Sequence, residues 1–160
     1  MKQSLKTWLA FWITSWIITT LGLMIWLSVW TNLKIAVIGW ILTIAIADAF
    51  SDALWIHISQ ESDHTNTARE VWESTISTFV AKFLVAITFI VPVLIFSSLI
   101  TATIVSAVWG LLLLWILSRY IAKNQKEKPF HVIREHVGIA IVVIIITYFV
   151  GVFISNTFGE

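Results

Sequence analysis

The chain has 160 residues, of which 59% are hydrophobic and 12% are charged. A soluble domain is closer to half apolar and a quarter charged, so this composition excludes a soluble globular protein and predicts an integral membrane protein. With no cysteine and a net charge of +1, the sequence offers no disulfide, no thiolate chemistry and no basic stripe for nucleic acid.

Five apolar runs are long enough to cross a bilayer, which needs about 20 apolar residues. They lie at residues 7–30, 33–56, 76–96, 99–120 and 131–155. The first two runs are separated only by Thr31 and Asn32, and the third and fourth only by Ser97 and Ser98. We therefore expect an all-α integral membrane protein in which one membrane domain contains five transmembrane helices.

The polar segment 57–75 is expected to form a short loop between the second and third spans. Within it, Thr67 and Glu70 have the spacing of a capping box, in which each side chain accepts from the backbone N–H of the other residue. If the second helix continued to about residue 62, His57, Glu61 and His64 would share one face. Imidazole and carboxylate groups are ligands for Zn, Fe or Mn, but an ordinary solvated loop explains this trio better.

The basic residues outside the spans predict the orientation in the membrane. Eight lie on the side of the N-terminus, and only Lys34 lies on the other side. The eight are Lys2, Lys6, Arg69, Arg119, Lys123, Lys126, Lys128 and Arg134. Because basic loops stay in the cytoplasm, we expect a multi-pass protein of the cell membrane with its N-terminus and segment 57–75 in the cytoplasm and its C-terminus outside.

Two carboxylates occur inside the second span. Asp48 and Asp52 are four residues apart and therefore share one helical face. Each costs roughly 2.5–3.5 kcal/mol near mid-membrane on insertion scales, which indicates a function. Oxygen ligands on one face suit a divalent cation, and two repelling carboxylates can exchange a proton. The alternative is a structural ion pair with Lys82 of the third span. The two interpretations are compatible if Lys82 holds the site when no cation is bound.

These features predict a transporter and not an enzyme. The sequence has no nucleophile motif, no phosphate-binding glycine loop and no His-Glu-x-x-His pair. An odd number of spans disfavours an inverted repeat within one chain, so we expect the ion path to lie between two identical subunits. Two alternatives stay open: a non-transporting membrane interaction protein with a structural Asp–Lys pair, and a proton-coupled carrier of another small solute.

Two segments carry a family resemblance. The stretch WITSWIITTLGLMIW can be laid without a gap on the pattern G-x-x-D-G-L-V-S-T-L-G-L-x-x-G, and SDALWIHISQ follows the pattern S-M-x-x-G-E-Y-V-S-V. Weaker similarities are Pro92 within the third span and the run ITYFVG in the fifth. These patterns are those of the vacuolar iron transporter family, which the chain resembles over most of its length.

The resemblance implies a homodimer without a tightly bound cofactor that moves Fe²⁺ or Mn²⁺ out of the cytoplasm in exchange for protons. The family's ligands do not carry over directly, since Ser15 stands where the family has Asp, Asp52 where it has Met and Ile56 where it has Glu. Asp48 and Asp52 are expected to replace the lost carboxylate function. The candidate metal ligands are Asp48, Asp52, Ser15, Thr19, Ser51, His57, Glu61 and His64.

The chain has ten tryptophans but only six glycines. Average usage would give roughly 11 glycines, and membrane helices contain more. Trp8, Trp12 and Trp16 are four residues apart, as are Gly22, Trp26 and Trp30. Glycine at these tryptophan positions would form the small-residue stripe through which membrane helices approach closely.

We therefore hypothesise that most of these tryptophans are glycines in the cell, encoded by UGA codons that some bacteria read as Gly. The positions are Trp8, Trp12, Trp16, Trp26, Trp30, Trp40, Trp55 and Trp115. The alternative is an aromatic belt at the membrane interfaces, which does not explain Trp12, Trp16, Trp26 or Trp40, because they lie inside the spans. Trp72 and Trp109 are interpreted as ordinary tryptophans.

Overall fold

The computed structural model describes residues 3–63, 65–125 and 128–158, with side chains for residues 14–63, 65–123 and 128–158. The described chain is all-helical, as the composition predicts, and contains no strand. The helices are α1 (Gln3–Thr31), α2 (Lys34–Glu61), α3 (Ala68–Ile95), α4 (Leu99–Gln125) and α5 (Pro129–Phe158). Each of the five is long and apolar enough to cross a membrane, which confirms the predicted number of spans.

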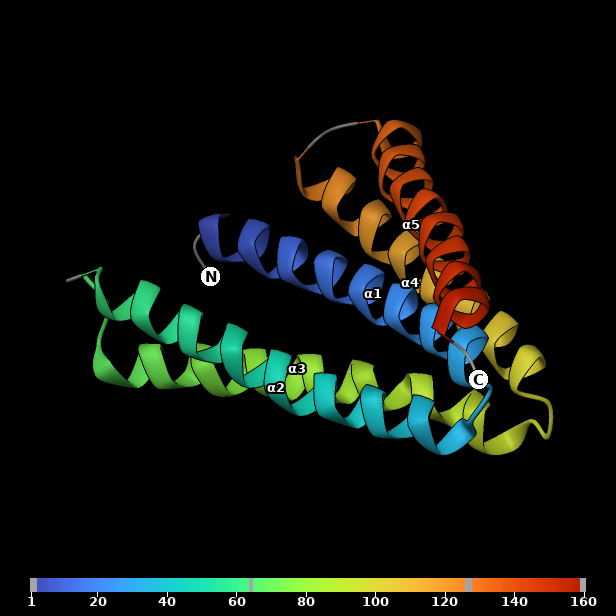
Figure 1. The fold of residues 1–160 in the computed structure, drawn as a ribbon. Helices are drawn as coiled ribbons and strands as arrows, with labels where there is room; N and C mark the ends of the chain where they lie inside the picture. Colours follow the sequence, from blue (N-terminus) through green and yellow to red (C-terminus); the bar gives the residue numbers. More distant parts are fainter. Residues whose placement is uncertain (1–2, 64, 126–127, 159–160) are drawn as a thin grey trace.

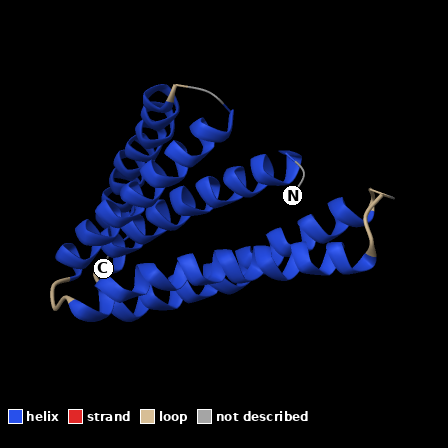
Figure 2. Ribbon diagram, turned by 180° about the vertical axis from the view of Figure 1, so that it is seen from behind, coloured by secondary structure: helices blue, strands red, loops and turns tan. Residues whose placement is uncertain are grey.

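The helices are arranged in two layers (Figure 1). In one layer α2 and α3 lie side by side as an antiparallel pair, and in the other α1 packs against α4 and α5. Figure 2 shows the same arrangement from behind, with the layers converging toward the α1–α2 and α3–α4 connections and separating toward the opposite end. Because five is an odd number of antiparallel helices, the two termini lie at opposite ends of the bundle (Figure 1).

The helices extend beyond the predicted spans. Segment 57–75, expected to be a loop, is helical up to Glu61 and again from Ala68, so the connection comprises only residues 62–67. The expected boundaries followed the loss of apolar side chains, whereas a helix continues as long as its backbone hydrogen bonds and caps allow. With 28 residues each, α2 and α3 are about 42 Å long and exceed the ~30 Å apolar core of a bilayer.

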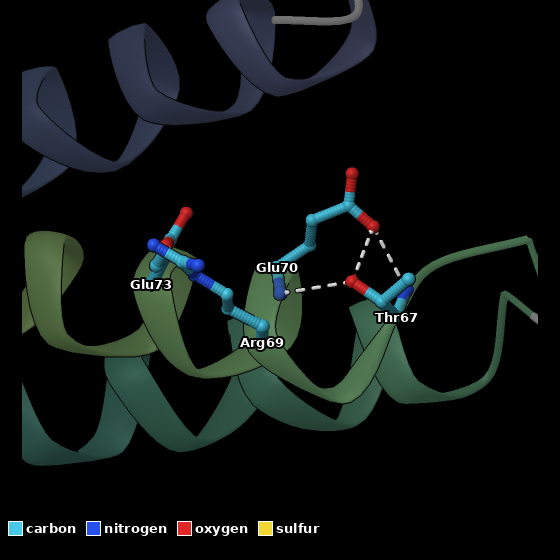
Figure 3. A network of polar contacts seen from close by, with 4 residues as sticks. All are labelled: Thr67, Arg69, Glu70 and Glu73. Atoms are coloured by element: carbon cyan, nitrogen blue, oxygen red, sulfur yellow. Dashed lines mark hydrogen bonds and ion pairs between the residues drawn. The ribbon is translucent and has the colours of Figure 1, made fainter.

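The predicted capping box fixes the start of α3 (Figure 3). The Thr67 hydroxyl accepts from the Glu70 N–H at 3.3 Å, and the Glu70 carboxylate accepts from the Thr67 N–H at 2.8 Å. One turn further on, the exposed Arg69 and Glu73 form an ion pair at 2.7 Å. The capping box satisfies two backbone N–H groups that the first helical turn leaves without partners, which explains why helix begins in a polar segment.

Tight connections join the helices at the other end of the bundle. Asn32, between α1 and α2, adopts a positive φ of 50°, a conformation that Asn tolerates better than most residues, and its N–H donates to the Ser28 carbonyl at 3.2 Å. After α3, Ser98 begins α4 by accepting from the Ala102 N–H through its carbonyl at 3.0 Å. Lys34 donates to the Phe96 carbonyl and thereby ties the start of α2 to the end of α3.

The α1–α5 interface is close because glycine occurs on both helices. A Cβ added to Gly151 of α5 would lie 2.9 Å from the Trp26 carbonyl oxygen of α1, and one added to Gly22 of α1 would lie 3.2 Å from the Thr147 and Val143 methyl groups of α5. A Cβ at Gly151 would force a backbone shift, and one at Gly22 would need its neighbours to move slightly, which is how small residues bring membrane helices together.

Candidate functional site

A buried lysine joins the middle of α3 to the middle of α2. The Lys82 ammonium donates to Asp48 Oδ2 at 2.7 Å and also to Asp52 Oδ2. Asp48 and Asp52 lie one turn apart on α2, so both carboxylates reach the same Nζ from one helix. The structure thus brings together the two aspartates of the sequence analysis and the lysine of its alternative. We call these three residues the charged cluster.

The charged cluster is closed on one side and open on the other. The exposed fraction of the side chain is 2% for Lys82, 7% for Asp52 and 39% for Asp48. Burial removes water from the ionised groups, and their mutual attraction and hydrogen bonds offset that loss. With all three groups ionised, two negative charges and one positive charge leave the cluster with a net charge of −1. This excess negative charge can attract a further proton or cation.

The neutral oxygen ligands predicted from the sequence are the hydroxyl groups of Ser15, Thr19 and Ser51. The Thr19 hydroxyl donates to the Ser15 carbonyl at 3.0 Å, a bond within α1. Ser51 lies on α2, directly before Asp52, but its side chain is exposed. Among the residues described, none of these three hydroxyls bonds to Asp48 or Asp52 in this conformation. Their role as metal ligands stays a prediction.

The structure describes only part of the second set of candidate metal ligands, near the end of α2. His57 Nδ1 lies 3.0 Å from Thr75 Oγ1 of α3, and its ring packs edge-on against Trp72 with the centroids 4.7 Å apart. Glu61 is exposed at the last residue of α2, and His64 lies outside the described residues. Over the part of the chain that the structure describes, no three His, Asp or Glu side chains come together in an arrangement that could hold a metal ion.

One polar pair was not expected from the sequence. The fully buried Ser118 of α4 lies with its Oγ 2.9 Å from His136 Nδ1 of α5. On the same helix His131 and Glu135 form an exposed contact at 3.3 Å. The second contact follows from i,i+4 spacing, whereas the Ser118–His136 pair depends on how far α4 is shifted along α5. The spacing of residues within α4 or within α5 does not predict how far the two helices are shifted along each other.

No protein-family model, no curated protein and no solved structure matches the chain. The fold and the charged cluster therefore define the class on their own. The chain is a multi-pass membrane protein with five apolar helices and an ion cluster buried between α2 and α3.

Proposed function

We propose that this protein is a divalent cation carrier that exchanges Fe²⁺ or Mn²⁺ for protons at the charged cluster. The observation that carries the proposal is the convergence of two carboxylates on one buried ammonium inside apolar helices. Ionisable groups at such positions are expensive and usually mark an ion or proton pathway. The resemblance of α1 and α2 to the vacuolar iron transporter patterns supports the choice of metal.

The cluster supplies the chemistry of exchange. The Lys82 ammonium occupies the place between two carboxylates that a bound cation would take. A divalent cation can bind there only when Nζ gives up its proton or moves away, because two positive charges repel strongly at contact distance. If Nζ gives up one proton as one M²⁺ binds, the cluster charge changes from −1 to 0. Metal entry is then coupled to proton release.

The proposal includes a homodimer and a direction of transport, out of the cytoplasm. Two carboxylates are too few for Fe²⁺ or Mn²⁺, which prefer a larger set of oxygen and nitrogen ligands. A second copy of the chain would complete the set, with Ser15, Thr19 and Ser51 as candidate neutral oxygens. The projecting end of α2, with His57 and Glu61, would collect metal in the cytoplasm for transport outward, and the predicted ligand His64 follows it in the sequence. The positive-inside rule supports this orientation.

A second candidate is favoured by the same contacts. Because Lys82 bonds both carboxylates in this conformation, it neutralises much of their charge without any cargo. The protein would then be a membrane interaction protein in which the cluster only holds α2 to α3. A proton-coupled carrier of another small solute would keep the cluster and change the cargo.

Metal flux into proteoliposomes distinguishes these candidates. The assay measures uptake of Fe²⁺, Mn²⁺, Zn²⁺ and Ca²⁺, singly and in competition, together with internal pH. The site variants are Asp48→Asn and Asp52→Asn, and the matched control is Glu73→Gln, an exposed carboxylate outside the cluster. Asp48→Asn keeps the Lys82–Asp52 contact and is therefore the variant most able to fold.

The carrier proposal expects Fe²⁺ or Mn²⁺ uptake with opposite proton movement, a loss of at least about tenfold in both Asn variants and no loss in Glu73→Gln. Unchanged flux in both folded Asn variants rejects the charged cluster as the site. No flux of any divalent ion through the unsubstituted protein favours the structural role. Proton movement that depends on a different solute favours a proton-coupled carrier of that solute.

A further inference from the structure

A groove of about 390 Å³ runs along the seam between α2 and α3, away from the charged cluster. Aromatic and aliphatic side chains form most of its wall, and Phe50 and Phe79 pack with their centroids 4.5 Å apart within it. The residues that matter to its chemistry are Phe50, Leu54, His57, Trp72, Thr75 and Phe79. Its volume lies in the range of small-molecule sites, which combine an apolar lining with a few placed polar groups.

The polar groups of this groove are His57 and Thr75, and their hydrogen bonds fix which nitrogen of a neutral His57 ring carries the hydrogen. The Thr75 hydroxyl has one hydrogen, which it donates to the Val71 carbonyl at 2.7 Å. Its oxygen must therefore accept in the 3.0 Å contact with His57, so the ring hydrogen lies on Nδ1. In the neutral ring Nε2 is then a hydrogen-bond acceptor, and the described residues give it no hydrogen-bond partner.

We propose that the groove binds a small amphiphile with an aromatic or short alkyl body and one hydroxyl, whose O–H donates to His57 Nε2. The aromatic walls suit such a body, and Thr75 holds the acceptor in place. Trp72 is exposed at this end of the groove, and Trp side chains favour the membrane interface, where the hydroxyl of an amphiphile also prefers to lie. The amphiphile site does not involve the charged cluster, but it uses the same His57 Nε2 that a metal ion would need.

Calorimetry on the full chain in phosphatidylcholine nanodiscs tests the groove with two matched probes, 4-butylphenol and 4-butylanisole. They differ in that only the phenol has an O–H to donate. The variants are His57→Phe, which keeps an aromatic ring without an acceptor, and Thr75→Val, which removes the group that fixes the tautomer. Ser77→Ala is the control, since its hydroxyl is exposed and bonds within α3.

We expect the phenol to bind the unsubstituted protein about tenfold more tightly than the anisole, and this preference to vanish in His57→Phe and weaken in Thr75→Val. Ser77→Ala should keep it. Equal affinities for the two probes, a preference that survives His57→Phe, or no saturable binding of either would overturn the proposal. Equal affinities would mean that the groove accepts lipid acyl chains only.

A separate observation concerns the tryptophans of α1. The indole N–H groups of Trp16 and Trp26 are buried without a hydrogen-bond partner, as is the hydroxyl of Thr20, one turn from Trp16. By contrast, Trp109 donates its N–H to Thr88 Oγ1 at 3.0 Å. A buried indole N–H usually finds a partner, because leaving it unpaired is unfavourable. Trp16 and Trp26 therefore differ from Trp109 as the glycine hypothesis predicts.

The backbone contacts of α1 point the same way. The Trp26 carbonyl lies where a Cβ on Gly151 would clash, so the α1 and α5 backbones approach closely at the turn that carries Trp26. Gly22, one turn earlier, also faces α5. Trp26 thus continues a close-contact stripe on which an indole has no polar partner. Trp8 and Trp12 have side chains outside the described residues.

We infer that positions 16 and 26 carry glycine in the protein that the cell makes, with UGA codons read as Gly. Two measurements test this: the codons in the gene, and the mass of the α1 peptide from the natural source. UGA codons with glycine masses are expected. UGG codons at 16 and 26, or tryptophan masses there, would overturn the inference.

A stability comparison tests the packing argument with a matched control. Trp26→Gly should leave the melting temperature unchanged or raise it, because it removes an unpaired buried N–H and restores the stripe. Trp109→Gly should lower it clearly, because it removes a hydrogen-bonded indole. If both variants lower the melting temperature equally, the packing argument fails whatever the codons are.

Discussion

Lys82 contacts Asp52 across the α2–α3 interface, and both side chains are almost completely buried. Lys82→Met would leave two carboxylates facing each other without a cation. We expect a loss of about 3–5 kcal/mol in the free energy of unfolding, because a buried ionic group without its partner keeps its desolvation penalty. Unfolding in mixed micelles with increasing dodecyl sulfate measures this loss. Combining Lys82→Met with Asp48→Asn and Asp52→Asn should recover most of it. A single variant as stable as the parent would show that the ion pair contributes little.

The glycines of the helices should respond differently to alanine. Gly151→Ala places a methyl group 2.9 Å from the Trp26 carbonyl oxygen, a backbone atom that moves only with α1. We expect a loss of about 1–3 kcal/mol, because α1 and α5 must separate. Gly39 is the control, since a Cβ there meets nothing within 4 Å, and Gly39→Ala should stabilise α2 by about 0.4–1 kcal/mol. Thermal melting of both variants decides this, and equal effects would contradict the close contact.

The start of α3 offers a prediction outside the membrane spans. Thr67→Ala removes one half of the capping box and should lower stability by about 0.5–2 kcal/mol. Arg69→Ala is the control, because the Arg69–Glu73 pair is highly exposed and should contribute nothing measurable. Hydrogen exchange of the first turn of α3 should rise in Thr67→Ala alone. Unchanged exchange there would show that tertiary packing, not the cap, holds this turn.

The Thr88–Trp109 hydrogen bond links α3 to α4. Thr88→Val removes the acceptor and leaves the Trp109 N–H unpaired, so we expect a loss of about 1–3 kcal/mol. Thr103→Val is the matched control, because the Thr103 hydroxyl donates only to the Leu99 carbonyl of its own helix. Thermal melting compares the two. If Thr103→Val lowers the melting temperature as much as Thr88→Val, the loss comes from removing any threonine hydroxyl in α3 or α4 and not from the Thr88–Trp109 hydrogen bond.

The helices themselves could be predicted from local patterns. Apolar runs gave their number, and the Thr67–Glu70 spacing gave the start of α3 correctly. The shared face of Asp48 and Asp52 follows from the helical period. The ends of α2 and α4 were placed too early, because polarity marks where the membrane ends and not where the helix ends. A polar residue such as Gln60 continues a helix as readily as an apolar one.

Contacts between helices could not be predicted in the same way. Lys82 was one alternative for the aspartates, but its simultaneous contact with both depends on the shift of α3 along α2. The His57–Thr75 and Ser118–His136 pairs depend on similar shifts. In a membrane, packing relies on close van der Waals fit more than on a hydrophobic stripe, so the sequence pattern carries little information about which faces meet.

The unequal exposure of Asp48 and Asp52 makes the two carboxylates of the charged cluster different for an approaching ion. Any ion that reaches the cluster in this conformation meets Asp48 first, and Asp52 forms the inner wall. An ion that leaves by the same route would simply return to its starting compartment. Net transport on this plan requires a second conformation in which the accessibility of the two carboxylates is reversed.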